Sequence, residues 1–98
     1  MSYERILNED RRLHILRLLD QSAGYSANAY LLGSALEGMG HAVSQDRLTA
    51  DLDWLAEQDL VRVDDVGSVV VATLTARGGD AAAGRTRVRG VKRPLPGE

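Results

Sequence analysis

The histidines and the acids beside them are the residues best suited to catalysis or metal binding. Asp10 and His14 stand four residues apart, a spacing that places both side chains on one face of a helix. His14 and His41 are the only histidines in the chain. A carboxylate and an imidazole can begin a metal site, but two ligands without cysteine or another histidine do not complete one. The spacing therefore predicts a carboxylate–imidazole pair on the surface and no metal site.

Other signatures of enzymes are missing from the 98 residues. The chain has no cysteine, which excludes thiol nucleophiles, thiolate metal sites and disulfides. It has no glycine-rich phosphate loop between a strand and a helix, and no His-Glu-x-x-His motif. We therefore expect a protein that is not an enzyme and has no cofactor. The absence of cysteine suits a reducing compartment, so a cytoplasmic location is expected.

Basic side chains are concentrated near the C-terminus. Residues 1–84 carry seven cations and thirteen acids, whereas residues 85–98 carry five cations and one acid. Two prolines, two glycines and a lack of apolar periodicity predict a flexible basic arm over residues 85–98, after a single domain over residues 1–84. Such an arm can follow a phosphate backbone. The alternatives are a solvated tail and an arm that docks on an acidic face of its own dimer.

The elements that must position these groups are predicted from periodicity and capping residues. Apolar residues with a period near 3.6 predict three helices, and a later switch to period 2 predicts a β-hairpin followed by a short helix. Leu48, Leu52 and Leu55 form the apolar stripe of the third helix, so Leu52 and Leu55 are expected in the core, with Thr49 and Asp53 exposed. The predicted helices are residues 3–20 after Ser2, 26–39 capped by Ser26, 45–58 after Ser44 and 75–83 capped by Thr75, and the strands are residues 60–63 and 68–73 around a turn at 64–67.

This order of elements is that of an α+β winged helix-turn-helix domain. Residues 44–61 resemble the stretch from the capped recognition helix into the first wing strand of bacterial regulators of the ArsR and MarR kinds, with Asp59 where glycine is usual. Residues 74–78 resemble the Leu-Thr-x-x-Gly that follows the wing in many of these proteins. The resemblance implies three helices, a two-stranded wing, a short C-terminal helix and a basic tail.

The whole chain also resembles a small protein family of Mu-like phages and prophages. The family is often labelled a transcriptional regulator, so the resemblance implies a winged-helix fold and a phage context. The segments that carry it are Met1-Ser2-Tyr3-Glu4, Arg11-Arg12-Leu13, Leu16-Arg17-Leu18-Leu19, the block from Asp51 to Val61, Ala72-Thr73-Leu74-Thr75 and Gly90-Val91-Lys92-Arg93-Pro94.

In a winged helix the third helix enters the major groove, while the wing contacts the backbone or the minor groove. Arg47 has the geometry to bind guanine and Gln45 the geometry to bind adenine. The expected function is that of a DNA-binding transcriptional regulator. The residues expected to contact DNA are Gln45, Arg47 and Thr49 in the groove, Arg62 on the backbone beside the wing, and Arg85, Arg87, Arg89, Lys92 and Arg93 on the phosphates.

Acids on the same elements favour an alternative function. The third helix carries four acids against one arginine, and the predicted wing tip is Asp64-Asp65, so this surface repels phosphate. The alternative is a non-enzymatic winged-helix module that binds a phage or host protein during phage development or assembly. The four acids of the third helix, expected to form a solvated face, are Asp46, Asp51, Asp53 and Glu57.

Partners other than double-stranded DNA are also constrained by the sequence. Regulators of this size commonly form two-fold dimers that bind palindromic sites, so a homodimer is expected. Ile6 and Leu7 lie apart from the apolar cluster of the first helix and are candidates for an interface with the fourth helix of a partner. No apolar run approaches the ~20 residues that a membrane span requires, and the polar segment 1–12 does not resemble a signal peptide.

Overall fold

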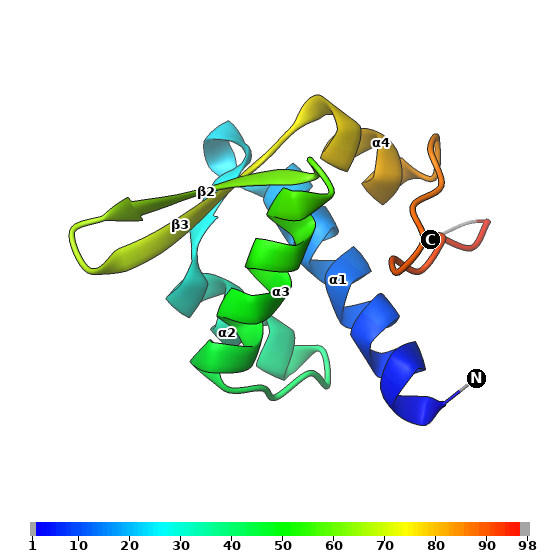
Figure 1. Ribbon diagram of the computed structural model, residues 1–98, viewed down its shortest axis with the longest axis horizontal. Helices are drawn as coiled ribbons and strands as arrows, with labels where there is room; N and C mark the ends of the chain where they lie inside the picture. Colours follow the sequence, from blue (N-terminus) through cyan, green and yellow to red (C-terminus); the bar gives the residue numbers. More distant parts are fainter. Residues whose placement is uncertain (1, 97–98) are drawn as a thin grey trace.

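The computed structural model describes residues 2–96, which form four α-helices and one three-stranded antiparallel sheet (Figure 1). This architecture confirms the predicted α+β class. In chain order the elements are α1 (Tyr3–Gln21), a 3-10 turn (Ala23–Tyr25), β1 (Ser26–Asn28), α2 (Ala29–Gly38), α3 (Gln45–Glu57), β2 (Val61–Val66), β3 (Val69–Leu74) and α4 (Ala76–Ala83). No helix within residues 2–96 has both the length and the hydropathy that crossing a membrane requires.

Three of the four predicted helix caps are confirmed. The side chains of Ser2, Ser44 and Thr75 each accept a hydrogen bond from the backbone N–H three residues later, at 3.0–3.1 Å. Each bond satisfies one of the N–H groups that a helix start leaves without an intrahelical partner. At the other end of α4, Gly84 takes a left-handed conformation with φ of 81°. The local sequence chemistry therefore sets where α1, α3 and α4 begin.

The predicted start of the second helix at Ser26 is wrong. Ser26–Asn28 forms the strand β1, which pairs with β3 and gives the sheet order β1-β3-β2. The Ser26 hydroxyl lies 3.0 Å from the hydroxyl of Thr73, and α2 is capped instead by Asn28, which accepts from the backbone N–H of Leu31 at 2.8 Å. A strand of three residues is too short to show a period-2 pattern in the sequence. Ser26–Asn28 is extended because its backbone pairs with the free edge of β3.

The hairpin is longer than predicted. Its ladder runs from Val61↔Leu74 to Val66↔Val69, so Asp64 and Asp65 are strand residues and the turn is Gly67-Ser68. Asp-rich stretches favour turns, but here the glycine that adopts a left-handed conformation, with φ of 67°, sets the turn position. The two strands therefore project as a long ribbon away from the helices (Figure 1).

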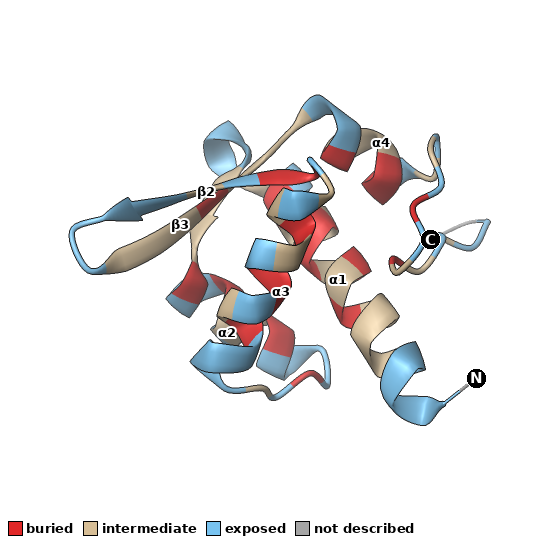
Figure 2. Ribbon diagram, viewed as in Figure 1, coloured by how far each residue is buried: buried red, intermediate tan, exposed pale blue. Residues whose placement is uncertain are grey.

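The core lies where α1, α2 and α3 meet beneath the sheet (Figure 2). Leu48, Leu52 and Leu55 are each fully buried, whereas Asp53 is exposed and Thr49 is half-buried. The predicted helical phase of α3 is therefore confirmed for the leucines and for Asp53, while Thr49 is less accessible than expected. The opposite side of α3 is left to solvent.

Replacing Leu52 with Ala should lower the free energy of unfolding by about 2–5 kcal/mol. The leucine is 0% exposed, so its loss removes buried apolar area and leaves a cavity between α3 and its neighbours. Urea denaturation of the two proteins measures the difference. Ala56→Gly, on a half-buried position of the same helix, controls for helix propensity and should cost about 1 kcal/mol. An equal loss in both variants would contradict the assigned core position.

Gly78 and Asp59 allow α4 to pack closely against the sheet. A Cβ at Gly78 would lie 2.0 Å from the carbonyl oxygen of Leu60, so only glycine lets α4 approach the backbone just before β2 this closely. Asp59 has a left-handed φ of 61°, which explains why glycine is usual at this position in the proteins that the segment resembles. Its carbonyl oxygen accepts a hydrogen bond from the Thr75 hydroxyl at 2.6 Å.

The structure differs from the expected free arm over residues 85–96, here called the C-terminal segment. It turns back and packs beside α1 and α4 (Figure 1). Val88 and Val91 are buried in the core, and the backbone N–H of Lys92 donates to the carbonyl of Glu9 at 3.1 Å. Two valines give no periodicity in the sequence, but their burial fixes the segment. Residues 97 and 98 of the predicted arm lie outside the described residues.

Candidate nucleic-acid interface

The exposed side of α3 carries the predicted base-contacting residues, but they are not equally available. Arg47 is exposed near the start of the helix. The side-chain amide of Gln45 donates to the carbonyl oxygen of Ala29 at 3.2 Å, which ties it to α2. Thr49 is half-buried. Arg47 is therefore the cation of α3 that is presented to an incoming ligand.

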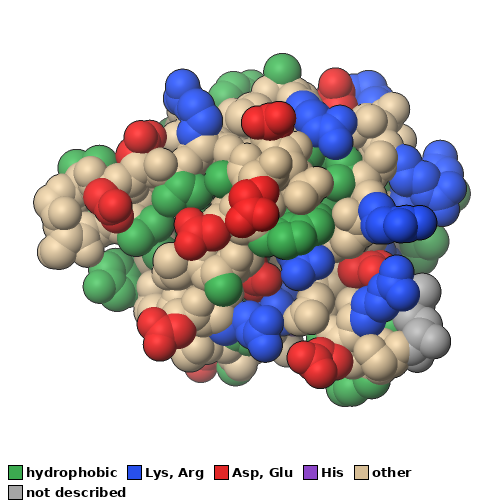
Figure 3. Space-filling model, in the orientation of Figure 1, with side chains coloured by type: hydrophobic (Ala, Val, Ile, Leu, Met, Phe, Trp, Pro, Cys, Tyr) green, Lys and Arg blue, Asp and Glu red, His purple; other side chains and the backbone are tan. Residues whose placement is uncertain are grey.

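Acids dominate the rest of this surface. Figure 3 shows acidic side chains spread over α3 and the β2–β3 hairpin, with few basic ones among them. Arg62 is exposed on β2 and is the cation nearest in sequence to the hairpin acids. The exposed acids of this region, here called the acidic surface, are Asp46, Asp53, Glu57, Asp64 and Asp65.

Asp51, expected on the solvated face, is instead buried. It is 2% exposed, and its carboxylate accepts two hydrogen bonds from the guanidinium of Arg11, at 2.5 and 3.2 Å. Arg11 is itself 4% exposed, and its other contact is the side-chain oxygen of Asn8 at 2.8 Å. The sequence contained a signal for this, because Asp51 lies three residues after Leu48 and four before Leu55, on the apolar stripe.

A stacked arginine connects α3 to the C-terminal segment. The guanidinium of Arg12 lies 4.1 Å from the ring centre of Trp54 and donates to the carbonyl of Gly90 at 3.0 Å. Gly90 has φ of 96°, and a Cβ there would lie 2.6 Å from the Trp54 ring. Burial lowers the pKa of Arg12 while the charge of Asp51 raises it, and the guanidinium stays protonated. Gly90 of the C-terminal segment therefore packs closely against the Trp54 ring of α3.

This docking gathers cations around one hollow of about 550 Å³, here called the basic groove. Its acid, Glu9, is paired with Arg5 at 3.1 Å. Arg85 does not take part, since it pairs with Asp80 at 2.9 Å. Basic side chains gather over this end of the molecule in Figure 3. The cations of the basic groove are Arg5, Arg87, Arg89, Lys92 and Arg93, of which only Arg5 was not predicted.

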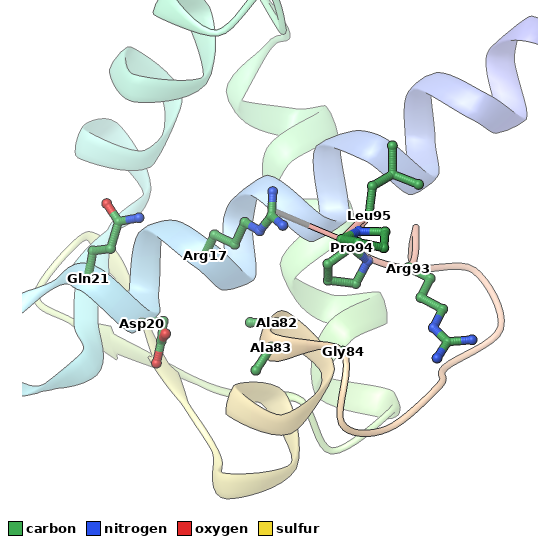
Figure 4. Close-up of a pocket in the computed structure, with 10 residues that line it drawn as sticks. Arg17, Asp20, Gln21, Ala82, Ala83, Gly84, Arg93, Pro94 and Leu95 are labelled. Carbon is green, nitrogen blue, oxygen red and sulfur yellow. The ribbon is translucent and has the colours of Figure 1, made fainter. Parts of the chain in front are cut away.

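A second hollow of about 550 Å³ lies between α1, the end of α4 and residues 93–96. Figure 4 shows Arg17 of α1 and the Pro94-Leu95 backbone side by side at its edge. Its lining combines alanines and prolines with the cations of Arg17 and Arg93 and the carboxylate of Asp20. This hollow therefore carries fewer cations than the basic groove, whose lining holds five. The basic groove is therefore the better candidate for phosphate.

The pair of Asp10 and His14 has a third member that the sequence did not indicate. His41, in the loop between α2 and α3, places its Nε2 2.7 Å from Oδ2 of Asp10, while Nε2 of His14 lies 3.4 Å from the same oxygen. Lys92 approaches the other oxygen of Asp10 at 3.4 Å. Burial raises the pKa of Asp10, but the His41 hydrogen bond and the charges of His14 and Lys92 outweigh it, so the pKa lies below its ordinary value.

Comparison with known proteins identifies two uncharacterized relatives, and no family model matches the chain. The chain is 52% identical over 91 residues to protein gp26 of Escherichia phage Mu, covering 93% of this chain and 94% of gp26. It is 36% identical over 78 residues to a protein of Haemophilus influenzae, covering 79% of this chain and 76% of that protein.

Among solved structures, the chain resembles hsRosR-S4, solved as a complex, with a TM-score of 0.63 and 24% sequence identity. The match covers 74% of this chain and 62% of that chain. At this identity the likeness concerns the fold, which is that of a winged helix.

Proposed function

The chain belongs to the family of phage Mu protein gp26, and we propose that it is a non-enzymatic DNA-binding protein that regulates transcription in the phage or prophage. The observation that supports this most is the basic groove. Its cations are held against the body of the fold by the contact of Gly90 with Trp54, which is a residue of α3. A positive surface fixed in advance beside the recognition helix binds phosphate without a large ordering cost.

In this proposal α3 enters the major groove and the basic groove follows the adjoining phosphate backbone. Arg47 binds guanine, the pairing that its planar donors favour. Asp46 and Asp53 accept hydrogen bonds from cytosine amino groups. Acids can therefore lie against the base edges, whereas acids beside phosphates are repelled. The residues of the hairpin tip, Asp64 and Asp65, stay away from the backbone in this arrangement.

A homodimer is part of the proposal, since two copies can bind the two halves of a palindromic site. The N-terminal end of α1 projects from the domain (Figure 1). Tyr3 and Ile6 are exposed there, and Leu7 is half-buried. These side chains supply an apolar patch that a second copy can cover.

The acidic surface favours a second candidate function. Five exposed acids on α3 and the hairpin form a surface to which a basic segment of a phage or host protein can bind. On this alternative the chain acts in phage development or assembly, and α3 faces protein rather than DNA. The two functions predict opposite effects when the acids of α3 are neutralised.

Replacing Asp46 and Asp53 together with Asn should tighten binding to random duplex DNA by roughly two- to thirtyfold. Each removed repulsion at an exposed site is worth about 0.2–1 kcal/mol. Fluorescence anisotropy with a labelled duplex measures the dissociation constant. The matched control is Asp20→Asn with Glu37→Gln, which removes two exposed charges from α1 and α2.

The outcomes separate the two functions. A larger gain for the α3 variant than for the control supports a DNA-facing α3. Equal affinities for the α3 variant and the parent protein would show that α3 does not face DNA and would favour the interaction module. A parent protein that does not bind duplex DNA at low salt would overturn the DNA-binding proposal itself.

A further inference from the structure

We propose that Asp10, His14 and His41 form a binding site for one divalent transition-metal ion of the zinc type. Two of the ligands come from consecutive turns of α1, and the third comes from the loop that leads into α3. The proposal rests on the position of these three side chains and does not depend on DNA binding.

The geometry is close to that of a zinc site before the ion enters. The three ligand atoms all lie within 4.8 Å of one another, and both imidazole Nε2 atoms face Oδ2 of Asp10. Tetrahedral zinc with bonds near 2.0–2.1 Å separates its ligand atoms by about 3.3 Å. The 3.4 Å between His14 and Asp10 already matches this separation. The contact of His41 with Asp10 needs to open by only about 0.6 Å.

The His41 ring is held by burial, and the His14 ring lies beside it. His41 is 6% exposed, and the His14 and His41 ring centres are 5.6 Å apart with their planes tilted by 55°. Tilted rings leave a space between their nitrogen atoms, whereas stacked rings would close it. His14 and Asp10 are each only partly buried, so water can complete the coordination and an ion can enter.

The donor set and the neighbouring charges determine which ions bind. Two imidazoles and one carboxylate suit Zn²⁺, Co²⁺ or Ni²⁺, whereas Mg²⁺ and Ca²⁺ prefer oxygen ligands. Lys92 opposes any cation, because its Nζ lies 3.4 Å from the second oxygen of Asp10. Removing this charge therefore strengthens a metal site and weakens a simple ion-pair cluster, which distinguishes the two.

The test is a titration of the full chain, carrying no polyhistidine tag, with Zn²⁺ by calorimetry and with Co²⁺ by visible absorption. We expect one ion per chain, visible Co²⁺ bands from a four- or five-coordinate site, and no heat from Mg²⁺. His14→Gln should weaken Zn²⁺ binding by about tenfold or more, since even outer-shell changes cost 10–100-fold. Lys92→Gln should tighten it. Asp80→Asn, which removes an acid paired with Arg85 outside the cluster, should leave it unchanged.

Three results would overturn the proposal. They are no Zn²⁺ binding at millimolar concentration, equal binding by His14→Gln and the parent protein, and weaker binding by Lys92→Gln. Circular dichroism shows that each variant is folded. If His41→Gln fails to fold because the residue is buried, the His14 and Lys92 variants decide the question.

Discussion

Asp51→Asn is expected to lower the free energy of unfolding by about 3–5 kcal/mol. The residue lies on α3, the helix expected to bind DNA, but its effect is on stability because its side chain is buried. The amide keeps the shape of the carboxylate but leaves the guanidinium of Arg11 charged and buried without its partner. Breaking a buried ion pair in this way lowers the free energy of unfolding by more than the intact pair contributes, because the remaining charge is buried away from water without an opposite charge. Urea denaturation followed by circular dichroism measures the loss.

The neighbouring acid of the same helix supplies the control. Asp53→Asn makes the same chemical change at an exposed position, and it should alter the free energy of unfolding by no more than about 0.5 kcal/mol. Replacing the whole pair, as Arg11→Met with Asp51→Leu, should recover most of the loss, since apolar residues of similar volume can substitute for a buried pair. Equal effects of Asp51→Asn and Asp53→Asn would mean that the ion pair is not buried in solution.

Removing Arg87, Arg89 and Arg93 together, each to Gln, is expected to produce the largest change in DNA binding. Within residues 2–96 no ion pair joins these three cations to an acid, so their charge is available to phosphate. Each phosphate contact adds about 0.9 to the slope of log affinity against log salt, so the slope should fall by about 2.7. Between 50 and 200 mM salt, the parent protein should lose about 40-fold more affinity than the variant.

The measurement is duplex binding by anisotropy at several salt concentrations, with Arg77→Gln as control. Arg77 lies on α4 outside the basic groove and donates to the carbonyl of Gln58, so its loss should leave the slope nearly unchanged. Arg47→Ala should instead relax the preference at one base pair, at a cost of about 1–3 kcal/mol. If the parent protein and the triple variant show the same salt slope, the basic groove does not contact DNA.

The order of the four helices and the β2–β3 hairpin was predictable because the information for it is local, whereas the strand β1 was not predicted. Ser2, Ser44 and Thr75 cap their helices by bonding to an N–H three residues later, which the sequence places within reach. The α3 leucines are buried because their spacing puts them on one side of any helix. The order of the helices and the hairpin, the phase of α3 and the likeness to winged helices follow from such contacts.

The tertiary structure decided which charged groups are available. Arg11 and Asp51 are 40 residues apart, and their pairing removes an acid from the surface that the sequence assigned to solvent. Arg12 and Gly90 are 78 residues apart, and their hydrogen bond helps turn an expected free arm into one wall of a groove.

His41 is 31 residues from Asp10, so the third member of the histidine cluster was not evident from spacing. Helix and strand periodicity reports which side of an element is buried. It does not report which distant segment covers that side, because this depends on how the helices and the sheet pack together. The helices and the β2–β3 hairpin of this protein were therefore set by local sequence, whereas the strand β1, the basic groove and the histidine cluster arise only from the packing of segments that are distant in the chain.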